Sequence, residues 1–254
     1  MRISLLVSTM VLAIAFNAVA SDGFSKEQLQ SIYDRVTPTM GLLKYSSEVT
    51  NANTGEASKR DRNALALVVS ETGLVMAHGH MKLENSDPFK ITVTLGQGDA
   101  EKEYDAVLLR KPDDVNVVFL QLQSETPLKL PYLRFTSSAN LGLGEAVGTF
   151  GLLGESLDYN RGLQVVRIGS VLEKPRLTYC LDTSVRFGFV TGPVVDTAGR
   201  VVGVVGFDLT SAEGGDLYVR SGHPLVYQSD LLAKYIKNPP RAKIMPGWAY
   251  LPSP

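Results

Sequence analysis

Short runs of apolar residues recur along most of this chain at a spacing of roughly ten residues. Gly, Asn, Asp or Pro stand between them. This rhythm predicts an all-β sandwich or barrel. It excludes a doubly wound α/β fold, because the helices that such a fold places between its strands are missing from the pattern. The runs expected as strands are TMGLLKYSSEV, NALALVVS, GLVMAH, KITVTLG, YDAVLLR, VNVVFLQL, EAVGTFG, QVVRIGSVL, VVGVVGFDL and DLYVRS.

Three segments depart from the strand rhythm. Between Ser25 and Val36 the apolar residues follow helical spacing, which predicts a short N-terminal helix with Ser25 as its cap. A second helical pattern, from Leu225 to Lys237, stops before a Pro-Pro pair and predicts a C-terminal helix. Residues 51–62 are polar and unpatterned, so we expect an exposed loop there.

The first residues have the features of a cleaved leader. Arg2 precedes an apolar run from Ile3 to Ala15, and Ala18-Val19-Ala20 is the small-x-small pattern that a signal peptidase accepts. The run is shorter than the roughly 20 residues that a membrane span needs. We therefore expect residues 1–20 to be removed and the mature chain, from Ser21, to be exported to the periplasm or secreted.

Charge and cysteine content narrow the classes of partner. The chain has 25 Lys and Arg residues against 26 Asp and Glu, with a net charge of -1. A balance of this kind gives no field that would attract nucleic acid or an anionic membrane.

Cys180 is the one cysteine in the sequence, so no intrachain disulfide can form, and we expect its side chain in the core.

Three further motifs carry the candidate chemistry. The segment ALVVSETGLVMAHGHM places His80 after a strand, a turn and a second strand. The segment YDAVLLRKPDDVNVVFLQL places Asn116 between an acidic turn and a strand. The segment DTSVRFGFVTGPVVDTAGRVVGVVGFDL contains a glycine-rich loop, then Pro193 and a hairpin turn at residues 197–200. In this order and at this spacing they resemble the HtrA/Deg branch of the trypsin-like serine proteases, from about residue 37 to 238.

The resemblance implies a trypsin-like double six-stranded β-barrel with a short N-terminal and a C-terminal helix. The protease-fold domain would span residues 21–240, with barrels over about 37–125 and 126–225, a helix over 225–237 and a Pro-containing tail over 241–254. No PDZ-like segment follows the C-terminal helix, so we do not expect the capture of chain ends that is usual in this family.

The same resemblance assigns the positions of a catalytic triad. His80 takes the place of the catalytic histidine, Asn116 that of the aspartate and Val190 that of the serine. The vestigial oxyanion loop consists of Gly188, Phe189, Thr191 and Gly192. Val190 has no heteroatom that could attack a carbonyl, and Asn116 carries no charge to stabilise an imidazolium. The sequence thus predicts a pseudoprotease without an intact catalytic site.

Several alternatives remain open. Thr191 or Ser184 could serve as a non-standard nucleophile in an active serine-type endopeptidase. His78 and His80, two apart and thus on one face of a strand, could bind a metal with His223; we instead expect no metal, and His78 as a surface or turn residue. Finally, the chain could be a structural subunit of an envelope assembly.

Other groups are expected to have no chemical role. Asp113 and Asp114 belong to a turn and are expected to be solvated. The aromatic-rich stretch from Arg186 to Phe189 either fills the former cleft or lines a remodelled binding site. We predict an HtrA-like adaptor or scaffold that binds a protein or peptide, without a cofactor, nucleic acid or a membrane anchor.

Overall fold

The computed structural model describes residues 23–50, 54–81, 88–109, 111–112, 114–135, 140–174, 176–183, 187, 192–206, 209–211, 217–219 and 224–240. For residues 49–50, 80, 209–211 and 217–219 it describes the backbone alone. No helix within these ranges is long and apolar enough to cross a membrane.

The N-terminal helix forms as the sequence predicts. Helix α1 (Lys26–Val36) begins at a capping box, in which the Gln28 N–H donates to Ser25 Oγ at 3.1 Å and the Ser25 N–H donates to Gln28 Oε1 at 2.7 Å. Such a box satisfies backbone donors that have no partner within the helix. Ile32 is buried on the inner face of the helix, and a 3-10 turn, η1 (Thr37–Thr39), leads into the first strand.

Strands β1 to β6 close into the first barrel, in the order β1-β2-β3-β6-β5-β4. All neighbours are antiparallel. The 3-10 turns η2 (Gly79–Met81) and η3 (Gly98–Ala100) interrupt the connections. The strands are β1 (Met40–Thr50), β2 (Ala57–Val68), β3 (Leu74–His78), β4 (Phe89–Leu95), β5 (Lys102–Leu108) and β6 (Val117–Leu122).

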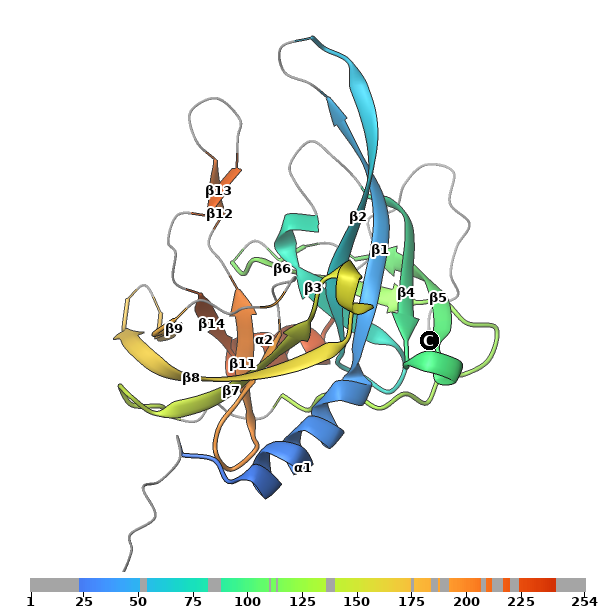
Figure 1. The fold of residues 1–254 in the computed structure, drawn as a ribbon. Helices are drawn as coiled ribbons and strands as arrows, with labels where there is room; N and C mark the ends of the chain where they lie inside the picture. The colour runs from blue at the N-terminus through green and yellow to red at the C-terminus, as the bar shows by residue number, and fades with distance from the viewer. Residues whose placement is uncertain are drawn as a thin grey trace, which may run out of the picture.

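The hairpin of β1 and β2 is longer than expected. Residues 57–62, which the polarity of the sequence assigned to a loop, continue β2 and pair with residues 45–50 of β1. Their side chains are exposed, so the segment has no apolar alternation to mark it as a strand. In Figure 1 this hairpin extends well beyond the rest of the barrel.

A second closed barrel follows in the order β10-β11-β14-β9-β8-β7, so the predicted pair of six-stranded barrels is confirmed. The turn η4 (Glu155–Leu157) lies between its first two strands. Strands β12 (Leu209–Ser211) and β13 (Leu217–Val219) form a separate two-stranded sheet. The barrel strands are β7 (Ala146–Leu152), β8 (Arg161–Leu172), β9 (Thr178–Leu181), β10 (Pro193–Val195), β11 (Val201–Gly206) and β14 (Leu225–Gln228).

The C-terminal helix is shorter than predicted. Helix α2 (Ser229–Lys237) starts four residues later than the pattern suggested, because residues 225–228 form β14. These residues pair with β11 on one side and with β9 on the other. Their apolar side chains fit a helical stripe and a buried strand equally well, so periodicity alone could not separate the two.

Three apolar clusters form the core. One fills the N-terminal barrel and another fills the C-terminal barrel. The third lies between the barrels and includes Phe119, Phe150 and residues of both helices. Neighbouring residues of one strand therefore face different clusters: Phe119 faces the inter-barrel cluster and Leu120 the interior of the first barrel.

The connection between β7 and β8 and the first residue of β8 join the two barrels by polar contacts. The Arg161 guanidinium donates to the carbonyl oxygens of Thr37 at 3.0 Å, Met40 at 2.8 Å and Gly96 at 2.7 Å. Nearby, Asn63 Nδ2 donates to Tyr159 Oη at 2.7 Å. These contacts help to set how the barrels lie relative to each other, on which any site between them depends.

Candidate functional site

The backbones around His80 and Asn116 lie next to each other. Strand β3 ends at His78, which pairs with Val117 at the start of β6. Directly beyond this pair, the Gly79 N–H donates to the Asn116 carbonyl oxygen at 2.8 Å. His80 is the middle residue of η2, and its side chain lies outside the described residues. The strand pairing thus brings two of the three expected triad positions to one end of the first barrel.

Gly79 gives the Asn116 side chain room to lie against the backbone. A Cβ atom at residue 79 would come within 2.8 Å of both the Asn116 carbonyl carbon and Lys111 Cε, and closer still to Asn116 Oδ1. Such distances are far inside van der Waals contact. The φ angle of Gly79 is not in the left-handed region, so this glycine is needed for space rather than for its backbone conformation.

His78 differs from its expected place. It is the last residue of β3 and is only 2% exposed, because this strand is buried on both faces. It is therefore neither a surface nor a turn residue. Since β3 ends at His78 and His80 lies in η2, the two histidines do not share a strand face. Within the described part of the chain, no group of three or more His, Cys, Asp or Glu residues could hold a metal ion.

Asp114 is exposed, as expected for a turn residue, and it is also attached to the C-terminal helix. Tyr235 Oη donates to Asp114 Oδ1, and Lys234 Nζ donates to Oδ2 at 3.3 Å. Arg176 lies 3.9 Å from the same carboxylate. Burial alone would raise the pKa of Asp114, but the hydrogen bonds from Tyr235 and Lys234 and the charge of Lys234 outweigh it and lower that pKa. These contacts anchor the turn that leads to Asn116.

The loop assigned to the nucleophile and oxyanion lies mostly outside the described residues. Val190, Gly188, Phe189, Thr191 and Ser184 fall there, as do Asp113 and His223. Gly192 is described and packs tightly against β7, where a Cβ atom would lie 2.8 Å from the carbonyl carbon of Phe150. Its own carbonyl oxygen accepts from the Val205 N–H at 2.9 Å. The end of the loop is thus fixed between β7 and β11.

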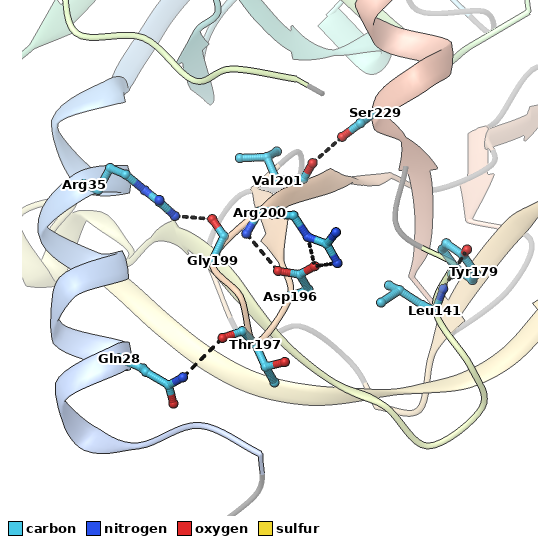
Figure 2. Close-up of polar contacts among 10 residues, drawn as sticks. All are labelled: Gln28, Arg35, Leu141, Tyr179, Asp196, Thr197, Gly199, Arg200, Val201 and Ser229. Carbon is cyan, nitrogen blue, oxygen red and sulfur yellow. Dashed lines mark hydrogen bonds and ion pairs between the residues drawn. The ribbon is translucent and has the colours of Figure 1, made fainter. Parts of the chain in front are cut away.

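The hairpin that follows this loop is held by α1 (Figure 2). Gln28 Nε2 donates to the Thr197 carbonyl oxygen at 3.4 Å, and Arg35 donates to that of Gly199. Within the turn, Arg200 forms an ion pair with Asp196 at 2.7 Å. Gly199 has φ +74, a conformation that side chains disfavour. The turn between β10 and β11 is therefore fixed both by its own residues and by the N-terminal helix.

Comparison with known families identifies this arrangement. The model of the trypsin-like peptidase domain family matches residues 65–204, a range that includes the positions of His80, Asn116 and Val190. The chain belongs to the trypsin-like peptidase domain family. The match also covers β3, β6 and the β10–β11 hairpin up to residue 204, which are the elements that hold the candidate site.

Solved structures place the trypsin-like domain near HtrA and Deg proteins in fold. A variant of the HtrA-type protease AlgW, solved with a decapeptide, superposes with a TM-score of 0.61 and 16% identity over 82% of this chain and 67% of that one. Deg5 gives a TM-score of 0.58 and 15% identity, over 82% of this chain and 91% of that one. The search of curated proteins gives no match.

In this trypsin-like domain, the residues at the serine and aspartate positions of the triad are assigned from the sequence motifs alone. The assignment of Val190 to the serine position stays a prediction, as does that of Asn116 to the aspartate position. Cys180 does not offer a replacement nucleophile of ordinary reactivity, because burial raises the pKa of its thiol and so lowers the thiolate fraction. It lies half-buried on β9, between the buried Tyr179 and Leu181, rather than in the core as expected.

Sequence reasoning missed one contact of this region. Phe187 is the described residue of the 184–191 stretch, and its ring lies against Gly151 of β7 and Gly162 of β8. Glycine inside a strand pattern can signal a close approach by another group. That signal was present in EAVGTFG and in the residues before QVVRIGSVL, but it could not identify the group that approaches.

Proposed function

We propose that this chain is an exported, catalytically inactive member of the trypsin-like family that binds a protein or peptide partner. The observation that carries the proposal is the residue set at the triad positions. The family match spans all three positions, and the sequence motifs assign valine to the position that needs a hydroxyl and asparagine to the position that needs a carboxylate. Valine cannot act as the nucleophile that acyl transfer requires, and asparagine does not supply the negative charge that stabilises the imidazolium.

The surroundings of the site support a retained fold rather than a decayed one. Gly79 leaves room for the Asn116 side chain, Asp114 is tied to α2, and α1 holds the hairpin after the loop. A scaffold of this kind, without its nucleophile, is suited to binding. The AlgW variant that shares the fold is solved with a decapeptide, which supports a peptide as the class of ligand. The leader-like residues 1–20 support export.

Proteolysis of an unfolded substrate tests the inactive part of the proposal. Purified wild-type protein should cleave reduced casein no faster than the matched His80→Ala variant, because the base has no hydroxyl to activate. Cleavage by wild type that His80→Ala abolishes would overturn the proposal and point to another nucleophile, with Thr191 and Ser184 as the first candidates.

A double variant, Val190→Ser with Asn116→Asp, extends the same assay. Cleavage by this variant at a rate above both other proteins would show that the triad positions are correctly assigned and that the missing side chains account for the inactivity. The assignment predicts that each single change gives far less activity than the pair, because triad members act as a unit.

A further inference from the structure

Phe187 lies on a pair of glycines that face each other across two strands. Gly151 of β7 and Gly162 of β8 are direct partners in the ladder. A Cβ atom on Gly151 would lie within 2.5 Å of Phe187 Cβ and Cδ2, and one on Gly162 would lie 2.6 Å from Phe187 Cε1. The phenyl ring therefore occupies the space in which two side chains of the hairpin would otherwise stand.

Space, rather than backbone conformation, explains these two glycines. Neither Gly151 nor Gly162 has a positive φ, so other residues could adopt the same backbone. Glycine inside a strand is unfavourable, because it loses more conformational freedom than other residues and has no side chain to pack. Leu153 adds a wall, since its Cδ2 atom lies 3.6 Å from the Cβ position of Gly162. We call the surface formed by Gly151, Leu153 and Gly162 the aromatic socket.

The ring in this socket belongs to the loop that carries the expected nucleophile position. Phe187 stands one residue before Gly188 and three before Val190. Its side chain is half-buried, so part of the residue faces solvent while the ring covers the glycines.

We propose that the aromatic socket is a binding site for an aromatic side chain of a peptide partner, and that Phe187 occupies it in the free protein. The proposal rests on the peptide-binding function proposed above and names the side-chain class that the site accepts. Phe187 itself shows that a phenyl ring fits. An incoming aromatic residue would displace Phe187, which is the neighbour of Gly188 in the sequence.

A vacated socket should bind a small aromatic probe. We expect N-acetyl-phenylalaninamide to shift the Gly151 and Gly162 amide signals of the Phe187→Ala variant saturably in NMR titrations, and N-acetyl-alaninamide not to do so. Wild type should bind at least tenfold more weakly, because its own ring competes. No saturable shift in Phe187→Ala, or equal binding by wild type, would overturn the proposal.

Two glycine substitutions supply matched variants. Phe187→Ala with Gly162→Ala fills the socket and should weaken probe binding at least tenfold. Phe187→Ala with Gly154→Ala is the control, since a Cβ atom at Gly154 meets no atom within 4 Å and should leave binding unchanged. Equal binding by both double variants would place the probe elsewhere and contradict the assignment.

A second measurement does not depend on the Phe187→Ala variant. In the otherwise wild-type protein, Gly162→Ala should expel the ring, so that chymotrypsin cleaves after Phe187 at least tenfold faster than in wild type or in Gly154→Ala. Unchanged cleavage would show that the ring does not depend on the glycine pair, which also contradicts the proposal.

Selection of random decapeptides displayed on phage separates this proposal from the function on which it rests. Peptides that bind wild type and lose affinity when an aromatic residue is replaced by alanine support both. Peptides that bind whether or not they contain an aromatic residue, and that do not compete with N-acetyl-phenylalaninamide, support the function and overturn the socket as a ligand site. Probe binding to Phe187→Ala without any selected peptide keeps the socket and overturns the function.

Discussion

Arg161 shows how one side chain can hold two barrels together. Its guanidinium is mostly buried and donates to three backbone carbonyl groups of the N-terminal barrel region. Burial lowers the pKa of Arg161, but arginine stays charged in proteins at any pH of interest. A planar group with several donors suits carbonyls that lie in different directions, which a lysine ammonium would reach less well.

Replacement of Arg161 by alanine should therefore destabilise the protein. Carbonyl groups left buried without a donor each cost about 1–3 kcal/mol, and we expect the free energy of unfolding to fall by about 2–4 kcal/mol. Urea denaturation measures the change. Arg167→Ala, on the same strand but at an exposed side chain, is the matched control and should change stability by about 0.5 kcal/mol or less. Equal effects of the two substitutions would contradict the role of Arg161.

Long-range contacts of single side chains, such as those of Arg161, could not be predicted from the sequence. Arg161 stands 121 residues from Met40, and nothing in the local sequence pattern shows that this charged side chain, at the start of a strand, is buried. The contacts of Asp114 with α2 and of Phe187 with its glycine pair have the same long-range origin. His78 was expected at the surface or in a turn, but it is the last residue of β3 and is buried.

At the scale of elements, helices and strands with a strong sequence pattern were predicted well. Short strands, and segments whose pattern fits a helix and a strand equally well, were not. Helix α1 was predicted with its cap, and β3, β6 and β11 were predicted from continuous apolar runs. These runs lack alternation because both faces of the strands are buried, one by a barrel interior and the other largely by the inter-barrel cluster. Strand β9, with four residues, was missed, and β14 was assigned to the start of the C-terminal helix.

The attachment of Asp114 to α2 should depend on pH. The pKa of its carboxyl is lowered in the folded protein, so the stabilisation is complete above the ordinary value of 3.8 and is lost as the pH falls through the lower folded value. Because the side chain is 43% exposed, solvent screening limits the effect to about 1 kcal/mol or less.

Asp114→Asn should accordingly reduce the free energy of unfolding at pH 7, and the difference from wild type should narrow as the pH is lowered from about 5 to about 2. Urea denaturation across this range measures both. Tyr235→Phe removes the hydroxyl donor and should reproduce part of the loss at neutral pH. A difference that does not change with pH would mean that the amide substitution acts through packing instead.

At the scale of the whole molecule, the inter-barrel cluster makes the two barrels and both helices one unit. Phe119 of the first barrel, Phe150 of the second, and Leu232 of α2 belong to the same buried cluster. The double barrel itself was predicted from the resemblance together with the strand rhythm. The rhythm alone could not distinguish a sandwich from a barrel, because the two share strand lengths and turns.

Loss of core volume in one barrel should therefore destabilise the other. Leu120→Ala removes a side chain from the N-terminal barrel interior and should cost about 2–5 kcal/mol. Hydrogen exchange under mild urea should show equal losses of protection at Val93 in the first barrel and at Val205 in the second. A loss confined to Val93 would indicate that the barrels unfold separately.

The docking of α1 onto the β10–β11 turn has a consequence for the time course of folding. Gln28 and Thr197 are 169 residues apart in the chain, and Arg35 and Gly199 are 164 apart. Closing a loop of that length costs entropy before any contact compensates, and folds rich in such contacts form slowly. An isolated helix of 11 residues is marginal in water. Helix α1, which precedes both barrels in the chain, is therefore among the last elements to become stable.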